Sequence, residues 1–221
     1  MRVMSGDGLF MDIMWMMMEP SDSVRYLSVT TTMWVVMMIA MMVPVVMPMV
    51  VVFRQLDRGA STEFDAVLFA IGYLLAWFGF SVAAAVLQWL LHGAGSLHGD
   101  LLSLRPLVAA GLLMVAGAYQ LTPLKEVCLE KCRSPIGFFL ANWRAGRVGA
   151  VRMGLHHGLF CIGCCWMLML IMFVGGAMSV ITMALLSAFI LAERVLPAGP
   201  WVARLPGVAL IVWGGYIATL A

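Results

Sequence analysis

Five cysteines are the residues in this sequence best suited to carry chemistry. They occur as Cys128-x3-Cys132 and as Cys161-x2-Cys164-Cys165. In helical segments these spacings place the sulfurs of each group on or near one helix face. A thiolate is a soft ligand that prefers Cu(I). If this region faces the cytoplasm, where thiols stay reduced, we expect metal binding or thiol redox chemistry and no structural disulfide.

An imidazole extends the second cysteine group. At about 100° per residue, His157, Cys161 and Cys164 lie within about 60° of one another on a helix, and Cys165 and Met172 lie at the edge of the same stripe. Polar groups inside apolar helices are costly unless paired, so they suggest function. The stripe predicts a soft-metal site. The alternatives are a thiol redox centre, or a satisfied histidine beside ordinary buried cysteines.

Methionine is unusually frequent, at 21 of 221 residues. One group lies within residues 9–18, and a second begins at Met33, where a spacing of four places Met37 and Met41 on one helix face. Thioethers bind Cu(I), so Met37 and Met41 are candidate ligands. Because Met38 and Met42 extend the methionines over much of the helix surface, flexible apolar filling is the competing interpretation.

The elements that must position these residues are apolar helices. Hydrophobic residues make up 63% of the chain and charged residues 11%, whereas a soluble domain has about 45–50% and about 25%. A helix needs about 20 apolar residues to cross a bilayer. Six stretches qualify: 28–53, 66–91, 101–121, 154–174, 178–196 and 201–220. The sequence predicts an all-α, polytopic transmembrane helical bundle of about six spans.

We divide the chain into an outer, Met-rich interfacial segment at 1–25 and a transmembrane helical domain at 26–221. The long connection at 122–153 is rich in Cys and Arg, and we expect short helices near 125–132 and 136–143 within it. Pro44 and Pro48 predict a kink in the first long helix. Gly154 and Gly158 allow a close helix neighbour, for which we expect the first long helix.

The basic residues indicate an orientation. With six spans, ten Lys and Arg residues fall on the side of the long connection and three on the other, which places that connection in the cytoplasm and both termini outside. Glu193 and Arg194 are expected to form an interfacial ion pair. His92, His98 and Asp100 are candidates for a weak outer capture site, or are solvated loop residues. Inter-helix hydrogen bonds are expected from four polar side chains, namely Tyr73, Gln88, Tyr119 and Gln120.

Several classes of function are disfavoured. The sequence has no phosphate-binding glycine loop, no Gly-x-Ser-x-Gly and no His-Glu-x-x-His. No set of catalytic acid, base and nucleophile supports an enzyme, so a non-enzymatic role is favoured. The basic connection is short and lacks interleaved aromatic residues, so we expect no nucleic-acid partner.

Three segments resemble a known family: residues 119–135, 143–146, and Gly-Leu-Phe-Cys-Ile-Gly-Cys-Cys-Trp at 158–166. Together with Met-Met-Val-Pro at 41–44 and Glu-Arg-Val-Leu-Pro at 193–197, they are similar to a bacterial family of predicted metal-binding integral membrane proteins, a domain of unknown function. The resemblance covers about residues 30–197. It implies metal binding in the cytoplasmic membrane and no particular activity.

The leading hypothesis is a membrane protein that binds Cu(I) for transport or delivery. Outer methionines would capture the ion, Met37 and Met41 would pass it to His157, Cys161, Cys164 and Cys165, and Cys128 and Cys132 would release it to the cytoplasm. The alternatives are an accessory or assembly subunit of a membrane metalloenzyme, and a membrane thiol-redox protein. The expected partners are the lipid bilayer and a metallochaperone or membrane metalloenzyme, and the sequence allows oligomerisation.

Overall fold

The structure is a computed structural model that describes residues 23–56, 62–98, 103–176, 179–195 and 201–220. The elements in chain order are α2 (Ser23–Leu56), α3 (Thr62–Gly93), β1 (Leu97–His98), β2 (Ser103–Leu104), α4 (Pro106–Gln120), α5 (Pro123–Arg133), α6 (Pro135–Asn142), α7 (Arg147–Leu170), α8 (Met172–Gly175), α9 (Val180–Val195) and α10 (Trp201–Leu220). The two short strands pair antiparallel, with Leu97 opposite Leu104. The expected helical class is confirmed apart from this small ribbon. The Met-rich segment at 9–18 lies outside the described residues.

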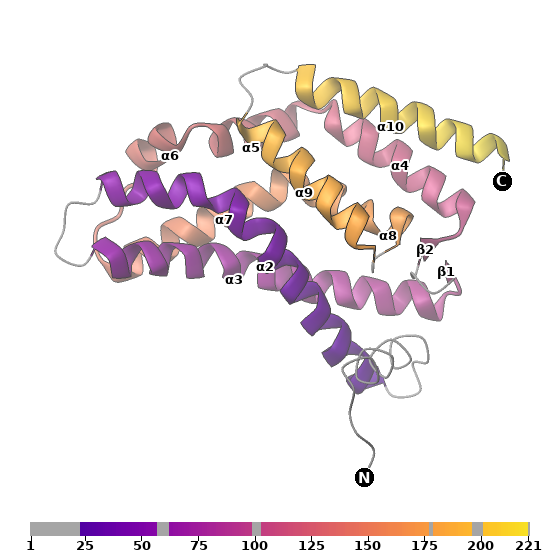
Figure 1. Cartoon of the computed structure of the whole chain (residues 1–221), viewed down its shortest axis with the longest axis horizontal. Coiled ribbons are helices and arrows are strands. Elements are labelled where there is room, and N and C mark those ends of the chain that lie inside the picture. The colour runs from indigo at the N-terminus through magenta and orange to yellow at the C-terminus, as the bar shows by residue number, and fades with distance from the viewer. Residues whose placement is uncertain (1–22, 57–61, 99–102, 177–178, 196–200, 221) are drawn as a thin grey trace, which may run out of the picture.

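The helices form two groups with α9 lying across them (Figure 1). In one group α3 packs along α7, and α2 packs on α3. In the other, α4 and α10 lie side by side. Helix α5 connects the groups, because it follows α4 directly in the chain and packs on α7. This connection brings the two cysteine-containing helices, α5 and α7, into contact.

Glycines allow α3 and α7 to approach closely. A Cβ atom at Gly72 of α3 would overlap the carbonyl oxygen of Val151, and one at Gly154 of α7 would overlap the carbonyl oxygen of Phe69. A Cβ atom at Gly158 would lie 2.7 Å from the Cβ atom of Ala76 in α3. The predicted contact at Gly154 and Gly158 is therefore present, but the partner helix is α3 and not α2. Small residues on both helices, rather than on α7 alone, decide this pairing.

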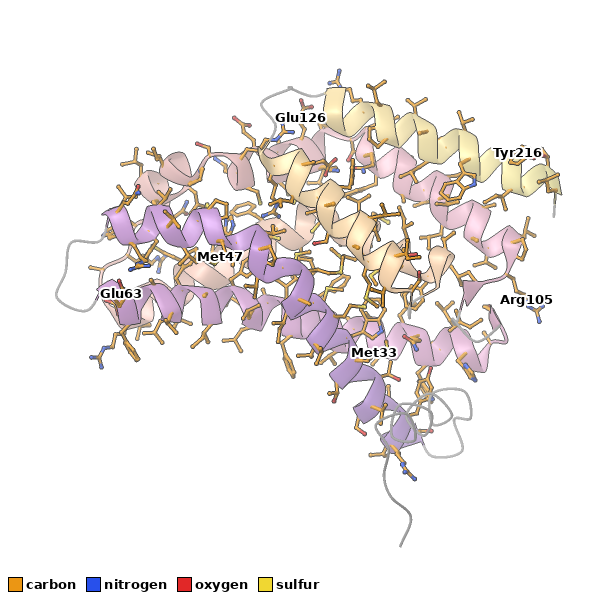
Figure 2. The ribbon with its side chains drawn as sticks, viewed as in Figure 1. Met33, Met47, Glu63, Arg105, Glu126 and Tyr216 are labelled. Carbon is orange, nitrogen blue, oxygen red and sulfur yellow. The ribbon has the colours of Figure 1, made fainter. Side chains whose placement is uncertain are left out.

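Helix α2 bends near its middle (Figure 1), and Pro44 and Pro48 lie inside it. A proline inside a helix removes a backbone hydrogen bond and pushes against the preceding turn, which accounts for the expected kink. Met33 and Met47 lie on the two arms of the bent helix (Figure 2). The buried residues of α2 recur every three or four positions and so form one continuous stripe: Tyr26, Thr30, Trp34, Met37, Met38, Met41, Met42, Val45, Val46, Met49 and Phe53.

The expectation of about six spans is not supported. By length and composition, three described segments are able to cross a membrane: Ser23–Leu56, Glu63–Gly93 and Arg147–Gly175. A fourth is obtained if α4 and α5, which meet at an angle of 64°, form one broken span. Helix α4 has 15 residues and α9 has 16, so each extends only about 23–24 Å against a hydrocarbon thickness of about 30 Å. Apolar composition without sufficient helix length thus explains why α4 and α9 do not qualify as single spans.

The connection at 122–153 contains the two short helices that the sequence predicts, α5 and α6. Each begins with a proline at its first position, where the missing N–H would have had no partner in the helix. Thr122 also caps α5, because its side-chain oxygen accepts a hydrogen bond from the Lys125 amide. The change of direction at Thr122 turns α5 away from α4 and toward α7.

Candidate metal centre

Three of the five cysteines lie together in the interior of α7. Cys161, Cys164 and Cys165 are all buried. The Cys164 and Cys165 thiols lie 3.1 and 2.8 Å from the carbonyl oxygen of Cys161, to which each donates a hydrogen bond. The helical spacing therefore places three sulfurs on adjacent positions of one face, as the sequence predicts for this segment.

Helix α5 adds a fourth sulfur from a distant part of the chain. Cys132 is buried, and its Sγ lies 4.0 Å from the Sγ of Cys164. Cys128, one turn earlier on α5, is only half-buried and rests against Gly163, where a Cβ atom would lie 2.9 Å from its sulfur. The absence of a side chain at Gly163 thus leaves space for α5 to bring its cysteines onto α7.

Arg194 of α9 supplies a positive charge to this sulfur group. One guanidinium nitrogen, Nη2, lies 2.7 Å from Cys161 Sγ and 3.4 Å from Cys164 Sγ. The expected ion pair between Glu193 and Arg194 is absent from the salt bridges of the described residues, because the two side chains serve different partners. Sequence reasoning missed this role of Arg194, although a charged residue at the end of an apolar helix was the available signal.

Glu193 instead pairs with Lys125 of α5. The Lys125 ammonium lies 2.7 and 2.9 Å from the two carboxylate oxygens, and it also donates to Gln120. Arg133 donates from Nε to the Glu193 backbone carbonyl at 2.7 Å. Burial raises the pKa of the Glu193 carboxyl above its ordinary value, while the Lys125 ammonium acts in the opposite direction. These contacts join α5 to α9 and so position Cys132 and Arg194 on either side of Cys164.

Hydrogen bonds join neighbouring helices, and two of them reach α7 near its cysteines. The Tyr73 hydroxyl of α3 lies 3.0 Å from Cys161 Sγ. The Tyr119 hydroxyl of α4 donates to the carbonyl oxygen of Gly163. Gln88 of α3 accepts from the Trp34 indole of α2 at 2.8 Å. The expected inter-helix roles of these three residues are confirmed, whereas Gln120 bonds across the break between α4 and α5.

His157 is fully buried in an aromatic environment. Its ring centroid lies 5.1 Å from that of Phe138, 5.7 Å from Tyr73 and 6.2 Å from Phe69. Neither ring nitrogen has a hydrogen-bond partner among the described residues. His157 is thus one turn away from Cys161 along α7, with both nitrogens unsatisfied.

The two methionines proposed as ligands, Met37 and Met41, are buried in the same hydrophobic core as the cysteines. Met38 and Met42 are buried there too, so the methionines of α2 form a broad packed surface. Ser187 of α9 donates to the Met41 carbonyl at 3.4 Å, next to the proline kink. These contacts place the methionines in the packing of α2 against its neighbours.

Of the residues expected at an outer capture site, only His92 has a described side chain. Its ring centroid lies 5.8 Å from that of Tyr26. His98 belongs to β1, and Asp100 lies outside the described residues.

No three His, Cys, Asp or Glu side chains within the described ranges converge closely enough to hold one metal ion together. The predicted ligands therefore do not form one polydentate site in this arrangement. What the sulfurs offer is a pair of thiols from two helices, Cys132 and Cys164, with Cys161 beside them and one cation against them. Two sulfur donors suit a soft, monovalent ion of low coordination number better than Zn(II), which takes four ligands.

A buried group of sulfurs from two helices, contacted by one cation, defines a helical protein suited to handling a soft metal. The family described as "PpoB2: Copper chaperone" matches residues 31–217. The chain therefore belongs to the PpoB2 copper chaperone family. No curated protein and no solved structure matches the chain. Membership supports the copper assignment reached from the cysteines.

Proposed function

We propose that this protein is a membrane-bound Cu(I) chaperone that binds the ion with Cys132 and Cys164, assisted by Cys161, and delivers it to another copper protein. The observation that carries this proposal is the 4.0 Å separation between the sulfurs of Cys132 and Cys164, which come from different helices. A copper ion between them would bridge α5 and α7. Thiolate ligands favour Cu(I), and membership of a copper chaperone family agrees with delivery.

The surface of the long helices supports a location in a membrane. Large apolar side chains are exposed along α2 and α3, among them Val36, Leu75 and Phe78, each more than half exposed. Contiguous exposed apolar surface on a soluble protein is rare and unfavourable. We assign the chain to the bacterial cytoplasmic membrane, with several spans and the sulfur site shielded from water.

The charge distribution supports an orientation that does not depend on the number of spans. Arg54 at the end of α2 pairs with Glu63 at the start of α3, and Arg147 at the start of α7 lies over the ring of Phe64. The end of α2 and the starts of α3 and α7 therefore lie at one end of the bundle (Figure 1). Applying the positive-inside rule to this end makes it cytoplasmic and places the N-terminus of α2 outside.

Cys128 provides a route into or out of the site. It lies one turn from Cys132 on the same helix and is half-buried, whereas Cys132, Cys161, Cys164 and Cys165 are buried. Ligand exchange between thiolates requires an accessible attacking sulfur. We assign Cys128 to the transfer of copper between the buried pair and an acceptor, such as a metalloenzyme or a soluble metallochaperone.

The test is copper binding by the purified full-length chain under anaerobic conditions. Competition with a coloured Cu(I) chelator measures both stoichiometry and affinity. The proposal expects that the variant with Cys161→Ser and Cys164→Ser loses most of the bound copper, and that Cys128→Ser keeps it but transfers it more slowly. An unchanged number of copper ions bound per chain in the double variant would refute the assignment of the copper site. Absence of copper flux in liposomes, with binding retained, would favour delivery or an accessory role over transport.

The same sulfur pair supports a second candidate, a thiol-redox function. The sulfurs of Cys132 and Cys164 are close enough that a small movement would allow a disulfide between α5 and α7. The sequence suggests a different pairing, in which Cys128/Cys132 and Cys161/Cys164 are two dithiol pairs that exchange disulfides. Thiol titration before and after exposure to a quinone distinguishes the candidates, because a chaperone keeps five free thiols.

A further inference from the structure

The charge around the sulfur pair carries an inference about which ions the site accepts. It rests on the proposed function, because it concerns the same sulfur group of Cys132, Cys161 and Cys164. The group that has no role in metal ligation, yet contacts the ligating sulfurs, is the guanidinium of Arg194. Its Nε atom is buried without a hydrogen-bond partner in the described part of the chain.

Arg194 is half-buried, and the Nε atom of its guanidinium is shielded from solvent without a partner, so the charge requires an anion nearby. Arginine stays protonated in proteins, and a buried charge is stable only when it is paired. The acceptors that Nη2 contacts are the sulfurs of Cys161 and Cys164. A neutral thiol is a weak acceptor, whereas a thiolate is a full counter-charge. The contact geometry therefore calls for one negative charge shared by the sulfur group.

The neighbouring charges do not supply this anion. Glu193 is adjacent to Arg194 in the chain, but its carboxylate pairs with Lys125. Arg133 donates to the Glu193 backbone carbonyl and not to a sulfur. Lys125 and Glu193 neutralise each other, so the charge balance at the sulfurs is set by Arg194 and by what the cysteines bind.

We infer that Arg194 makes the site selective for monovalent soft ions, Cu(I) and its analogue Ag(I), over divalent ions. A monovalent ion held by two thiolates forms a complex with one negative charge, which balances the guanidinium of Arg194. A divalent ion held by the same two thiolates forms a neutral complex and leaves the guanidinium without a counter-charge. Thus only monovalent binding preserves neutrality in a low-dielectric environment.

The contact between Arg194 and the sulfurs indicates which substitution of Arg194 should conserve the selectivity for monovalent ions. A single nitrogen, Nη2, makes both sulfur contacts. The planar fork of arginine is therefore not used for bidentate recognition, and a lysine ammonium should supply the same charge. Arg194→Gln removes the charge and retains hydrogen-bonding capacity. Arg133→Gln is a matched control, because it removes a neighbouring guanidinium that does not contact sulfur.

The experiment measures the affinities of Ag(I), Cu(I), Zn(II) and Cd(II) for the purified full-length protein and for these variants. Arg194→Gln should weaken Ag(I) and Cu(I) binding by about tenfold or more, the loss expected for one charge-assisted contact, and should leave Zn(II) and Cd(II) binding unchanged or tighter. Arg194→Lys and Arg133→Gln should keep the wild-type ratio of monovalent to divalent affinity.

A ratio that stays constant in Arg194→Gln would overturn the inference, as would a parallel loss for all four ions. If Arg194→Gln does not fold, the wild-type protein and the Arg194→Lys variant still test the inference. A wild-type protein that binds Cd(II) as tightly as Ag(I), or a folded Arg194→Lys variant that has lost the preference, overturns the inference. A failure of this inference can be distinguished from a failure of the proposed function. In the second case the wild-type protein binds neither Cu(I) nor Ag(I).

Discussion

The Sγ atoms of Cys132 and Cys164 lie 4.0 Å apart although the residues belong to helices α5 and α7. The shared site exists because α5 turns away from α4 at Thr122 and rests on the Gly163 surface of α7. A metal bound there would tie the connection at 122–153 to the core of the bundle. Copper loading should therefore stabilise the contact between α5 and α7.

Loss of the α5 ligand should impair copper binding as strongly as loss of an α7 ligand. We expect Cys132→Ser to weaken Cu(I) affinity by more than about 100-fold, since changes to residues that only hydrogen-bond to metal ligands already cost about 10–100-fold. Cys165→Ser is the control, because Cys165 is buried on the same face and donates only to the Cys161 carbonyl, which a serine hydroxyl can also do. Equal losses in the two variants, measured by chelator competition, would contradict a site shared between α5 and α7.

Glu193→Gln should strongly destabilise the fold. Lys125 and Glu193 are 1% and 2% exposed, and removing one partner of a buried ion pair costs about 3–5 kcal/mol because the other charge stays buried. Glu126→Gln, at the exposed contact with Arg204, is the control and should change stability by less than about 1 kcal/mol. Denaturant unfolding in detergent measures both. Similar stabilities of the two variants would show that the buried pair does not hold α5 against α9.

Two glycines of α3 should respond in opposite ways to substitution by alanine. Gly72→Ala places a methyl group against the Val151 carbonyl of α7, so α3 and α7 must separate and stability falls. Gly79→Ala meets nothing within 4 Å and should raise stability by up to about 1 kcal/mol, because alanine favours the helix. Thermal unfolding of both variants tests this contrast, and a stable Gly72→Ala protein would argue against the close helix contact.

His157→Phe should stabilise the protein without bound metal. Both imidazole nitrogens are buried without partners, and an unsatisfied buried polar group costs about 1–3 kcal/mol. A phenyl ring suits the aromatic surroundings from Phe69, Tyr73 and Phe138. The melting temperature of the metal-free protein provides the measurement. A lower melting temperature contradicts this prediction, whereas an accompanying loss of bound copper would support the ligand role that the sequence suggests.

The sequence alone was sufficient for the local features. Helical periodicity and spacing predicted that Cys161, Cys164 and Cys165 share a face, that two short helices lie within the connection at 122–153, and that Pro44 and Pro48 bend α2. These features depend on interactions within about one helical turn, which residue type and spacing determine. The expected count of six spans is not supported. Amino-acid composition indicates which segments are apolar, but it does not indicate where a helix ends, as the helix does at the break after Gln120.

Only the tertiary structure decided which residues meet at the site. No sequence pattern indicated that Cys132 would approach Cys164, or that α3 would be the neighbour of Gly154. Nor did a pattern indicate that Glu193 would pair with Lys125 while Arg194 contacts the sulfurs. Such pairings join segments far apart in the chain, and each depends on how several helices pack at once. The chemistry of soft-metal binding could be read from residue types, whereas the placement of the charge that balances it required the fold.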